Sequence, residues 1–337
     1  MLRIGVIGCG YWGPNLIRNF CKLEDVQLVG VADISAGKLE SIKRHYPFVR
    51  TSTLPRELLE ANDVDAVAIA TPISTHHELA RAALERGKHV LLEKPMTRTV
   101  AEAEELVDLA ERKRRILMVD HTFIYAGAVR FIRELIDSGE LGDVYYYDSV
   151  RVNLGLFQHD LNVLWDLGPH DFSIMCHLVK KKPVRVSAVG SRPVAWKDWN
   201  LESVAYINIW FHDGTMAHFH LNWLSPVKVR RTMIGGSRRM VIYDHLDPDN
   251  QVKVFDKGVD VRTTEEQYRL LVQYRSGDMV APKIDQTEAV ETVCRHFVDC
   301  IAERREPLTD GRAGLEVLRL LETAQESMVN QGSPVDL

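Results

Sequence analysis

The residues Gly8 to Gly13 read G-C-G-Y-W-G, a G-x-G-x-x-G spacing that can bind the diphosphate of a dinucleotide. The motif follows a predicted strand and opens a predicted helix, whose first N–H groups would face the phosphates. Gly8 permits the tight turn, Gly10 lets the backbone approach the diphosphate, and Gly13 allows close helix packing. Tyr11 and Trp12 lie in the same loop, so we expect them at the cofactor as well.

Asp33 indicates which dinucleotide binds. It ends the next predicted strand, 20 residues after Gly13. A carboxylate there accepts hydrogen bonds from the ribose hydroxyls and repels a 2′-phosphate, which favours NAD over NADP. Because Lys38 is a cation near Asp33, NADP stays an alternative cofactor. A glycine turn that binds nothing would explain the glycines but would leave Asp33 unexplained.

Two further polar segments follow apolar strands. A-T-P-I-S-T-H-H starts at Ala70, and E-K-P occupies Glu93 to Pro95. Ligands of a doubly wound parallel sheet bind beyond the carboxyl ends of its strands. We therefore expect both segments on the cofactor's side of the sheet.

The segment D-L-G-P-H-D, Asp166 to Asp171, places a carboxylate and an imidazole four residues apart. Pro169 suits a first helical turn, which predicts that His170 lies at a helix N-terminus. The helix dipole would keep the imidazole neutral and able to accept a proton, as a general base for alcohol oxidation must be. Asp171 would favour the helix start rather than take part in catalysis, and a capping or core role is the alternative for His170.

The run AIATPISTHHELARAALERGKHVLLEKP, together with D-L-G-P-H-D and the ending EPLTDGRAGLEVLRLLETA, resembles the Gfo/Idh/MocA family of NAD(P)-dependent sugar and cyclitol oxidoreductases. The resemblance covers essentially the whole chain. It implies an N-terminal Rossmann domain, residues 1–121, and a C-terminal α/β domain with an open, mainly antiparallel sheet, residues 122–337. The C-terminal helices can pack back on the first domain, and the exposed face of the second sheet would form a homodimer or homotetramer.

The resemblance also implies catalytic roles. Lys94 would donate a hydrogen bond to the hydroxyl being oxidised and stabilise its alkoxide character. His170 would accept the proton and Asp166 would orient one or both groups, although the sequence leaves open whether His170 or Lys94 finally holds the proton. The peptide bond before Pro95 is expected to be cis. Many members carry an acid where this chain has Ser173.

Four more residues are expected near the cofactor by the same resemblance: Thr71, Pro72, His76 and Glu93. Glu93 would contact the nicotinamide ribose, and a purely structural carboxylate is the alternative. His77 belongs to a helix start.

Substrate-binding groups are expected mainly from the second domain. By resemblance, His121 and Tyr125 face the substrate cleft. Asp120, directly before His121, occupies a position where similar sequences often have glycine. Arg151, Asn153 and Gln158 carry groups that can bond sugar hydroxyls.

Arg230 belongs to a basic cluster that comprises Lys228 to Arg231, Arg238 and Arg239. Guanidinium groups suit a diphosphate, which favours a nucleotide-linked sugar. A strand edge protected by charge is the alternative. The resemblance likewise points to nucleotide-sugar and surface-polysaccharide pathways.

The elements that position these groups follow from the apolar pattern. Before residue 121, short β-rich runs alternate with amphipathic stretches, which predicts an α/β fold with a doubly wound parallel sheet. Thr99 to Glu102 has the spacing of a capping box. Further along, helices are predicted at 127–138, 288–304 and 312–329. Longer runs predict one antiparallel sheet from 143–153, 184–194, 203–211 and 216–224, with a hairpin at Asp213-Gly214.

Composition narrows the partners. The chain has 337 residues, 45% of them hydrophobic, and a net charge of -5, which argues against nucleic acid or a membrane surface as partner. Five cysteines without a C-x-x-C pair signal neither disulfides nor a metal site, as in a reducing cytoplasm. No apolar stretch is long enough to span a bilayer, and Met1 leads directly into a short strand, so we expect a cytoplasmic protein.

The leading hypothesis is an NAD-dependent oxidoreductase that acts on a secondary hydroxyl or keto carbon of a sugar, at C3 of a nucleotide-linked hexose. The alternatives are a free aldose or inositol dehydrogenase, a glycosidase that retains NAD, and a dinucleotide-binding sensor without catalysis. The joint presence of Lys94, Asp166 and His170 argues against the sensor.

Overall fold

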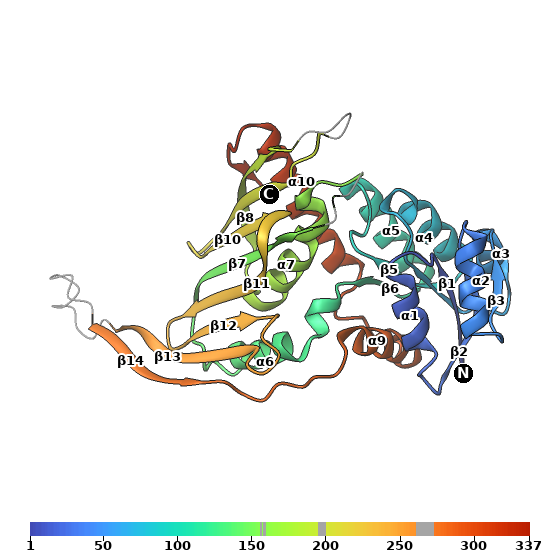
Figure 1. Cartoon of the computed structure of the whole chain (residues 1–337), viewed down its shortest axis with the longest axis horizontal. Helices are drawn as coiled ribbons and strands as arrows, with labels where there is room; N and C mark the ends of the chain where they lie inside the picture. Colours follow the sequence, from blue (N-terminus) through green and yellow to red (C-terminus); the bar gives the residue numbers. More distant parts are fainter. Residues whose placement is uncertain (156, 158–159, 195–199, 261–272) are drawn as a thin grey trace. The chain divides into compact units, whose positions relative to one another are not determined.

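The structure, a computed structural model, describes residues 1–155, 157, 160–194, 200–260 and 273–337 (Figure 1). The chain divides into two compact units, each with its own sheet. The first unit comprises Met1–Tyr125 and Thr287–Arg319, and the second comprises Ala126–Gln286 and Leu320–Leu337.

The first unit contains a six-stranded parallel sheet in the order β3-β2-β1-β4-β5-β6. Its strands are β1 Leu2–Ile7, β2 Val26–Ala32, β3 Arg50–Ser52, β4 Ala66–Ile69, β5 His89–Glu93 and β6 Leu117–Asp120. This strand order is that of a Rossmann fold, so the predicted doubly wound sheet is confirmed. The order reverses between β1 and β4, where such sheets bind their ligands. The short polar strand β3 has no apolar pattern and was not predicted.

Helices complete the first unit. They are α1 Gly13–Phe20, α2 Ala36–His45, α3 Pro55–Glu60, α4 His76–Glu85, α5 Val100–Lys113 and α9 Ala289–Glu303, with the 3-10 turns η1 Ile73–Thr75 and η2 Thr122–Tyr125. The hydroxyl of Thr99 accepts the N–H of Glu102 at 3.2 Å, as a capping box requires. The Glu102 carboxylate accepts the N–H of Arg98 at 3.0 Å, one residue earlier than in the ideal motif.

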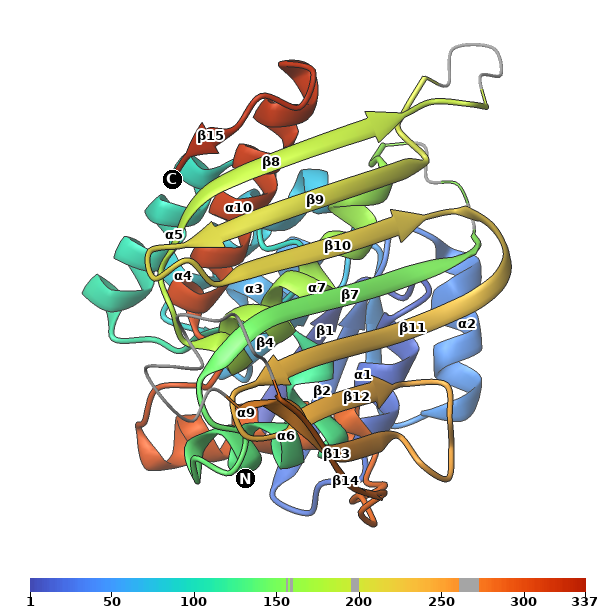
Figure 2. The same ribbon diagram turned by 90° about the vertical axis from the view of Figure 1, so that its left-hand side faces the viewer.

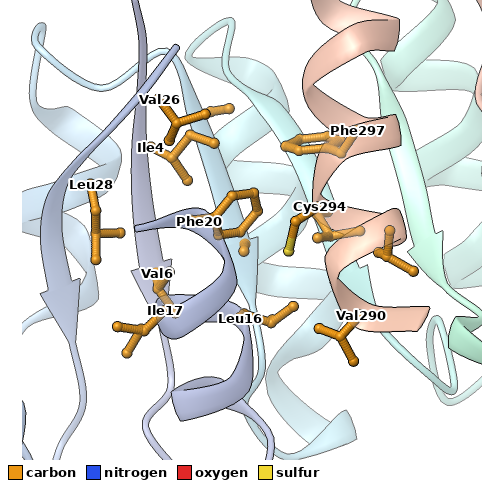
Figure 3. Packing of buried hydrophobic residues seen from close by; sticks show 14 of the residues in the cluster. Ile4, Val6, Leu16, Ile17, Phe20, Val26, Leu28, Val290, Cys294 and Phe297 are labelled. Atoms are coloured by element: carbon orange, nitrogen blue, oxygen red, sulfur yellow. The ribbon is translucent and has the colours of Figure 1, made fainter. Parts of the chain in front are cut away.

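The core of the first unit contains residues from both of the chain segments that make up this unit. α1 presents Leu16, Ile17 and Phe20 to the sheet residues Ile4 and Val6 and to α9, as Figure 3 shows. α9 contributes Val290, Cys294 and Phe297 to the same cluster. Because these side chains are almost fully buried, the hydrophobic effect ties α9 to the Rossmann sheet.

The second unit is built on a nine-stranded sheet, drawn face-on in Figure 2. Its order is β14-β13-β12-β11-β7-β10-β9-β8-β15. The strands are β7 Val144–Leu154, β8 Pro183–Ser191, β9 Val204–Phe211, β10 Met216–Asn222, β11 Leu224–Gly236, β12 Met240–Asp244, β13 Val252–Asp260, β14 Gln273–Val280 and β15 Val335–Asp336. All neighbours pair antiparallel except β7 and β10, which are parallel.

The predicted hairpin at Asp213-Gly214 joins β9 to β10, and Gly214 adopts a φ of +86° that suits glycine. The predicted mainly antiparallel sheet is confirmed, although β7 and β10, which were expected within one antiparallel group, pair in parallel. The chain leaves β7 and returns through α7, β8 and β9, so β10 runs in the same direction as β7 when it pairs with it. The strands from β11 onward were not predicted, because the charged residues in β11 were interpreted only as a basic cluster.

Among the described residues of the second unit, the helices are α6 Gly127–Asp137, α7 Val163–Val179 and the part of α10 Gly311–Val329 from Leu320 onward. α7 covers one face of the sheet, where the rings of Phe172 and Phe219 lie 4.8 Å apart. Among the described residues, no helix has the length and apolar character needed to cross a membrane.

The start of α7 differs from the prediction. Asn162 caps the helix, since its side-chain oxygen accepts the N–H of Trp165 at 3.1 Å. Pro169 therefore lies inside the helix, and His170 is not at a helix N-terminus. The capping amide of Asn162 outweighs the preference of proline for a first turn, and the dipole argument does not apply to His170.

Candidate functional site

The glycine loop of the first unit has one open position and two closed ones. Gly8 has a φ of +101°, and a Cβ added there would collide with the carbonyl oxygen of Ala70. A Cβ at Gly13 would collide with the carbonyl oxygen of Gly8, whereas one at Gly10 would meet no atom within 4 Å. The loop is thus closed toward the protein and open at Gly10, the position where a diphosphate approaches the backbone. These residues fit NAD.

Asp33 follows β2 and is held beside this loop. Its carboxylate accepts the N–H of Cys9 at 2.6 Å and the N–H of Ser35 at 2.8 Å. The adjacent Ile34 is 88% exposed. Sequence reasoning did not single out Ile34, although an apolar residue directly after the β2 acid is visible in the sequence.

The two aromatic residues of the glycine loop differ in their surroundings. Tyr11 is 91% exposed. The Nε1–H of Trp12 donates to the Asp120 carboxylate at 2.9 Å, which ties the loop to the end of β6. Only Tyr11 therefore offers its whole ring to a ligand of this loop.

His76 joins the two other loops that were predicted near the cofactor. Its Nδ1 lies 2.9 Å from the carbonyl oxygen of Pro95, and its Nε2 lies 2.8 Å from that of Thr71. The side chain is buried, and burial lowers the pKa of its imidazole. His76 thus brings the segment of Thr71 and Pro72, after β4, to the turn that carries Lys94.

Lys94 directly follows β5 and is half-buried, and its peptide bond to Pro95 is cis, as predicted. The Glu93 carboxylate before it is buried and accepts the N–H of Lys94 at 3.2 Å. Burial and the nearby Asp120 raise the pKa of Glu93 well above its ordinary value. His121 is 2% exposed, and burial followed by the charge of Lys94 lowers the pKa of its imidazole to about 3.

Asp166 and His170 lie one turn apart on α7 of the second unit, both half-buried. The Nε1–H of Trp223 donates to the Asp166 carboxylate at 3.2 Å and so fixes its orientation. Trp223 was read only as part of a strand, and nothing local in the sequence indicated this contact. Of the three proposed catalytic residues, Lys94 belongs to the first unit and the other two to the second.

The structure corrects the interpretation of Arg151 and Asp171. Arg151 Nε donates to the Asp171 carboxylate at 2.6 Å, and both side chains are almost fully buried. The hydroxyl of Ser149 donates to the same carboxylate at 3.1 Å. Asp171 lies in the interior of α7 rather than at its start, and Arg151 links that helix to β7. We therefore withdraw Arg151 as a sugar-binding residue.

Tyr125 is corrected in the same way. It is 3% exposed within the core of the first unit, and its hydroxyl lies 3.0 Å from that of Thr309. Its hydroxyl is therefore engaged inside its own unit and is withdrawn as a substrate contact. Asn153, in β7, is half-buried and stays a candidate. Gln158 lies outside the described residues.

The basic cluster is divided by the fold. Arg230 of β11 is in register with Arg151 of β7, and its side chain shares the α7-facing side of the sheet with Thr232. Arg231 points to the opposite face, where it pairs with Asp244 at 2.7 Å. Arg239 pairs with Glu140 at 2.6 Å, beyond the end of α6. Since β12 pairs with β11 from Arg231 to Gly235, the alternative of a protected strand edge does not hold for Arg231.

The His245 imidazole in the second unit is influenced by several positively charged side chains. Burial first, and then the charges of Arg230, Arg151 and Lys228, lower the pKa of its imidazole to about 4. Tyr243 places its hydroxyl 3.0 Å from the Nδ1 atom of His245. Arg230 therefore brings positive charge to the face of the sheet that α7 also covers, and Lys228 is near enough for its charge to act on the same imidazole.

All five cysteines are free. Within the part of the chain that the structure describes, no group of three His, Cys, Asp or Glu side chains could hold a metal ion.

Comparisons with known proteins agree with this geometry. Residues 2–121 match the family model described as an oxidoreductase family with an NAD-binding Rossmann fold, and residues 129–242 match the model described as the GFO/IDH/MocA C-terminal domain. Together the two models match more than half of the chain.

Similar full-length proteins act on different substrates. The UDP-N-acetylglucosamine 3-dehydrogenase of Acidithiobacillus ferrooxidans is 28% identical over 321 residues, which cover 94% of each chain. The scyllo-inositol 2-dehydrogenase (NAD(+)) of Bacillus subtilis is 25% identical over 355 aligned positions, covering 100% of this chain and 96% of that protein.

Solved structures show the same architecture. The UDP-N-acetylglucosamine 3-dehydrogenase of Acidithiobacillus ferrooxidans matches with a TM-score of 0.80 and 25% identity, over 98% of this chain and 99% of that one. The aldose-aldose oxidoreductase of Caulobacter crescentus matches with a TM-score of 0.83 and 21% identity, over 100% and 99% of the two chains.

Proposed function

Because the chain belongs to the Gfo/Idh/MocA family and is an NAD-dependent oxidoreductase that acts on sugar CH–OH groups, we propose that its substrate carbon is C3 of a nucleotide-linked hexose. One observation of the structure supports this choice: Arg230 lies on the α7-facing side of the second sheet, and its charge and that of Lys228 both act on His245. A free aldose or cyclitol has no diphosphate that would need these cations.

The residues of the first unit bind and orient the cofactor. Gly8, Gly10 and Gly13 receive the diphosphate, Asp33 binds the adenosine ribose, and Ile34 and Tyr11 offer exposed apolar surface. Bound NAD supplies the acceptor for a hydride from the carbinol carbon. Asp33 favours NAD, because its carboxylate would repel the 2′-phosphate of NADP.

The proton of the substrate hydroxyl leaves by a separate route. Lys94 donates a hydrogen bond to the hydroxyl oxygen, and His170 accepts the hydroxyl proton as the C–H hydride departs. Asp166, held by Trp223, orients the imidazole and stabilises the imidazolium that forms. Asp166, one turn away on α7, thus favours the protonated ring as it forms, whereas a helix N-terminus at His170 would have favoured the neutral ring.

A panel assay tests the reaction class and the substrate together. Purified protein with NAD is given UDP-N-acetylglucosamine, other nucleotide hexoses, free aldoses and inositols, and NADH absorbance is followed. We expect turnover with a nucleotide hexose, and Lys94→Ala should lower kcat by at least ~100-fold while NAD binding persists. Turnover of inositols or free aldoses alone would contradict the nucleotide sugar, and product release without net NADH would indicate a glycosidase. No turnover of any sugar, with NAD still bound, would favour the sensor.

Arg230 and Arg231 form a matched pair for testing the diphosphate contact. They are adjacent in sequence but lie on opposite faces of β11. Arg230→Ala should raise KM for the nucleotide sugar by about 10-fold or more, the value of a lost hydrogen bond to a charged group, and should leave KM for NAD unchanged. Arg231→Ala should change neither constant, and equal effects of both variants would contradict the assignment.

The outer face of the second sheet is the proposed oligomer interface. Tyr146, Tyr206 and Met216 are 39%, 42% and 40% exposed on the face opposite α7, and the Tyr206 ring stacks on His220 at 4.5 Å. Apolar surface on an uncovered sheet face favours burial against a second copy. Light scattering should show a dimer or tetramer that Tyr206→Glu shifts toward the monomer.

A further inference from the structure

Two buried carboxyl groups lie side by side at the carboxyl ends of β5 and β6. Glu93 and Asp120 are direct partners in the parallel register, so their side chains emerge next to each other from one face of the sheet. Glu93 is 9% exposed and Asp120 is 1% exposed. Two carboxylates in such a setting repel each other, and little water is present to screen them.

The two carboxyl groups have different partners. Both oxygens of Asp120 accept hydrogen bonds, one from Trp12 Nε1 at 2.9 Å and one from the hydroxyl of Thr122 at 2.6 Å. Glu93 accepts the N–H of Lys94 through Oε2, and its buried Oε1 has no hydrogen-bond partner among the described residues. Asp120 is therefore the member with donors that stabilise a negative charge, whereas Glu93 has an oxygen on which a proton can reside.

We propose that Glu93 and Asp120 hold a single proton, carried by Glu93, and that Asp120 is a positioning residue which sets this proton and tethers Trp12 of the glycine loop. This inference deepens the proposed function, since it concerns the turn that carries Lys94. Asp120 also stands where the resemblance led us to expect glycine, so the arrangement belongs to this chain's own sequence.

The charges around the pair agree with this assignment. Burial first and Asp120 second raise the pKa of Glu93, and Lys94 opposes them. Burial first, and the charge of Asp120 after it, raise the pKa of Tyr125 and of Cys294. They stay neutral at neutral pH and add no competing charge. The imidazole of His121, beside Lys94, is neutral as well.

A protonated Glu93 has a consequence for Lys94. An ionised Glu93 would attract the ammonium of the adjacent Lys94. It would therefore compete with the substrate hydroxyl for a hydrogen bond from that ammonium. A neutral Glu93 does not attract the ammonium in this way, and its carboxylic O–H adds a donor at the cofactor's edge of the sheet. Glu93 would then donate a hydrogen bond through Oε1, while Oε2 still accepts the N–H of Lys94.

Infrared spectroscopy tests the proton without any turnover. Protein labelled with ¹³C-glutamate at its carboxyl carbon is compared with unlabelled protein at neutral pH, and the C=O stretch of a protonated carboxylic acid is followed. We expect one such glutamate band in the wild type, its loss in Glu93→Gln, and its titration at least ~1 pH unit lower in Asp120→Asn. Glu93→Gln resembles the protonated acid in shape and should fold.

Two infrared results would overturn the proposal: absence of the band from the wild type, or a band that survives Glu93→Gln. Both are readable even if no sugar is oxidised, so they are distinct from a failure of the proposed function. Thr122→Val is the matched control, because it removes a hydrogen bond to Asp120 but keeps the charge. It should shift the titration in the opposite direction to Asp120→Asn, or leave it unchanged.

A double-mutant cycle tests the tether. NAD affinity is measured by calorimetry for Trp12→Phe, Asp120→Ala and the double variant. Each single change removes the same hydrogen bond, so we expect each to weaken NAD binding several-fold and the double variant to add little to Asp120→Ala. Fully additive effects would contradict a tether between the two residues.

Discussion

At the scale of single residues, His76 shows how one buried side chain serves two loops. Its two ring nitrogens each face a backbone carbonyl, one from the segment after β4 and one from the turn after β5. A neutral ring can donate only one of these two hydrogen bonds. The packing around the buried side chain holds both ring nitrogens in place. The position of the Lys94 turn therefore depends on a residue that needs no direct contact with substrate.

Replacement of the buried His76 should destabilise the protein more than replacement of the neighbouring His77. His76→Ala removes a buried partner of two carbonyl groups and should lower the free energy of unfolding by about 1–3 kcal/mol and reduce kcat. The neighbouring His77→Ala removes an exposed contact with Glu105 and should cost about 0.5 kcal/mol or less. Urea denaturation and NADH assays on both variants check this, and equal losses would contradict the clamp.

Asp33 is the residue on which cofactor choice depends. Asp33→Ala removes the acceptor for the ribose hydroxyls and the repulsion of a 2′-phosphate. We expect KM for NAD to rise by roughly 10–100-fold and KM for NADP to fall relative to it. Lys38→Ala, on the exposed start of α2, is the control and should leave KM for NAD unchanged. An unchanged ratio of the two cofactors in Asp33→Ala would contradict the role of this carboxylate.

At the scale of elements, α7 is the helix that carries two of the three proposed catalytic residues. Its position against the sheet depends on apolar contacts such as Phe172 with Phe219, and on the buried pair of Arg151 and Asp171. The Asn162 side chain begins the helix and also donates to Glu202 at 2.8 Å. The helix is thus fixed at its start and along its buried face, so Asp166 and His170 occupy defined positions.

The buried ion pair should behave as a unit. Asp171→Asn leaves the Arg151 guanidinium without its counter-charge in a dry site and should lower the free energy of unfolding by about 3–5 kcal/mol. The double change Arg151→Met with Asp171→Leu removes both charges and should recover most of that loss. Chemical denaturation measures both variants, and a double variant less stable than Asp171→Asn would contradict this account.

At the scale of the whole molecule, buried histidines should make the protein sensitive to acid. Burial lowers the pKa of His89, His177 and His245 to about 4 and that of His121 to about 3. An unfolded histidine binds its proton near pH 6.5, so below that pH the unfolded chain takes up protons that the folded chain does not. Stability is then full above about pH 6.5 and falls as the pH drops toward 4.

We expect each of these histidines to lower the free energy of unfolding by on the order of 1 kcal/mol at pH 5. Glu93, whose pKa is raised, should act in the opposite direction. Denaturant unfolding at pH 7 and pH 5 measures the loss. His177→Asn should reduce the pH dependence, whereas His45→Gln, at an exposed position, should not. A stability that is flat or rises between pH 7 and pH 5 would contradict the prediction.

Local sequence patterns determined the architecture of the first unit and the composition of its site. The alternation of strands and helices, the glycine spacing and Asp33 were all readable because each reflects interactions between residues close in sequence. The same is true of the capping hydroxyl of Thr99 and of the hairpin at Gly214. The family resemblance added Lys94, Asp166 and His170 as a group, which spacing alone would not have joined.

Tertiary structure decided the partners of the side chains. It placed Asp171 against Arg151, Trp12 against Asp120, Trp223 against Asp166 and Tyr125 against Thr309. It also moved the start of α7 to Val163 and made β7 and β10 parallel. These outcomes depend on contacts between residues far apart in the chain, whose energies arise only when burial removes water from both partners. The sequence therefore determined which groups exist and on which elements, and the fold decided which of them meet.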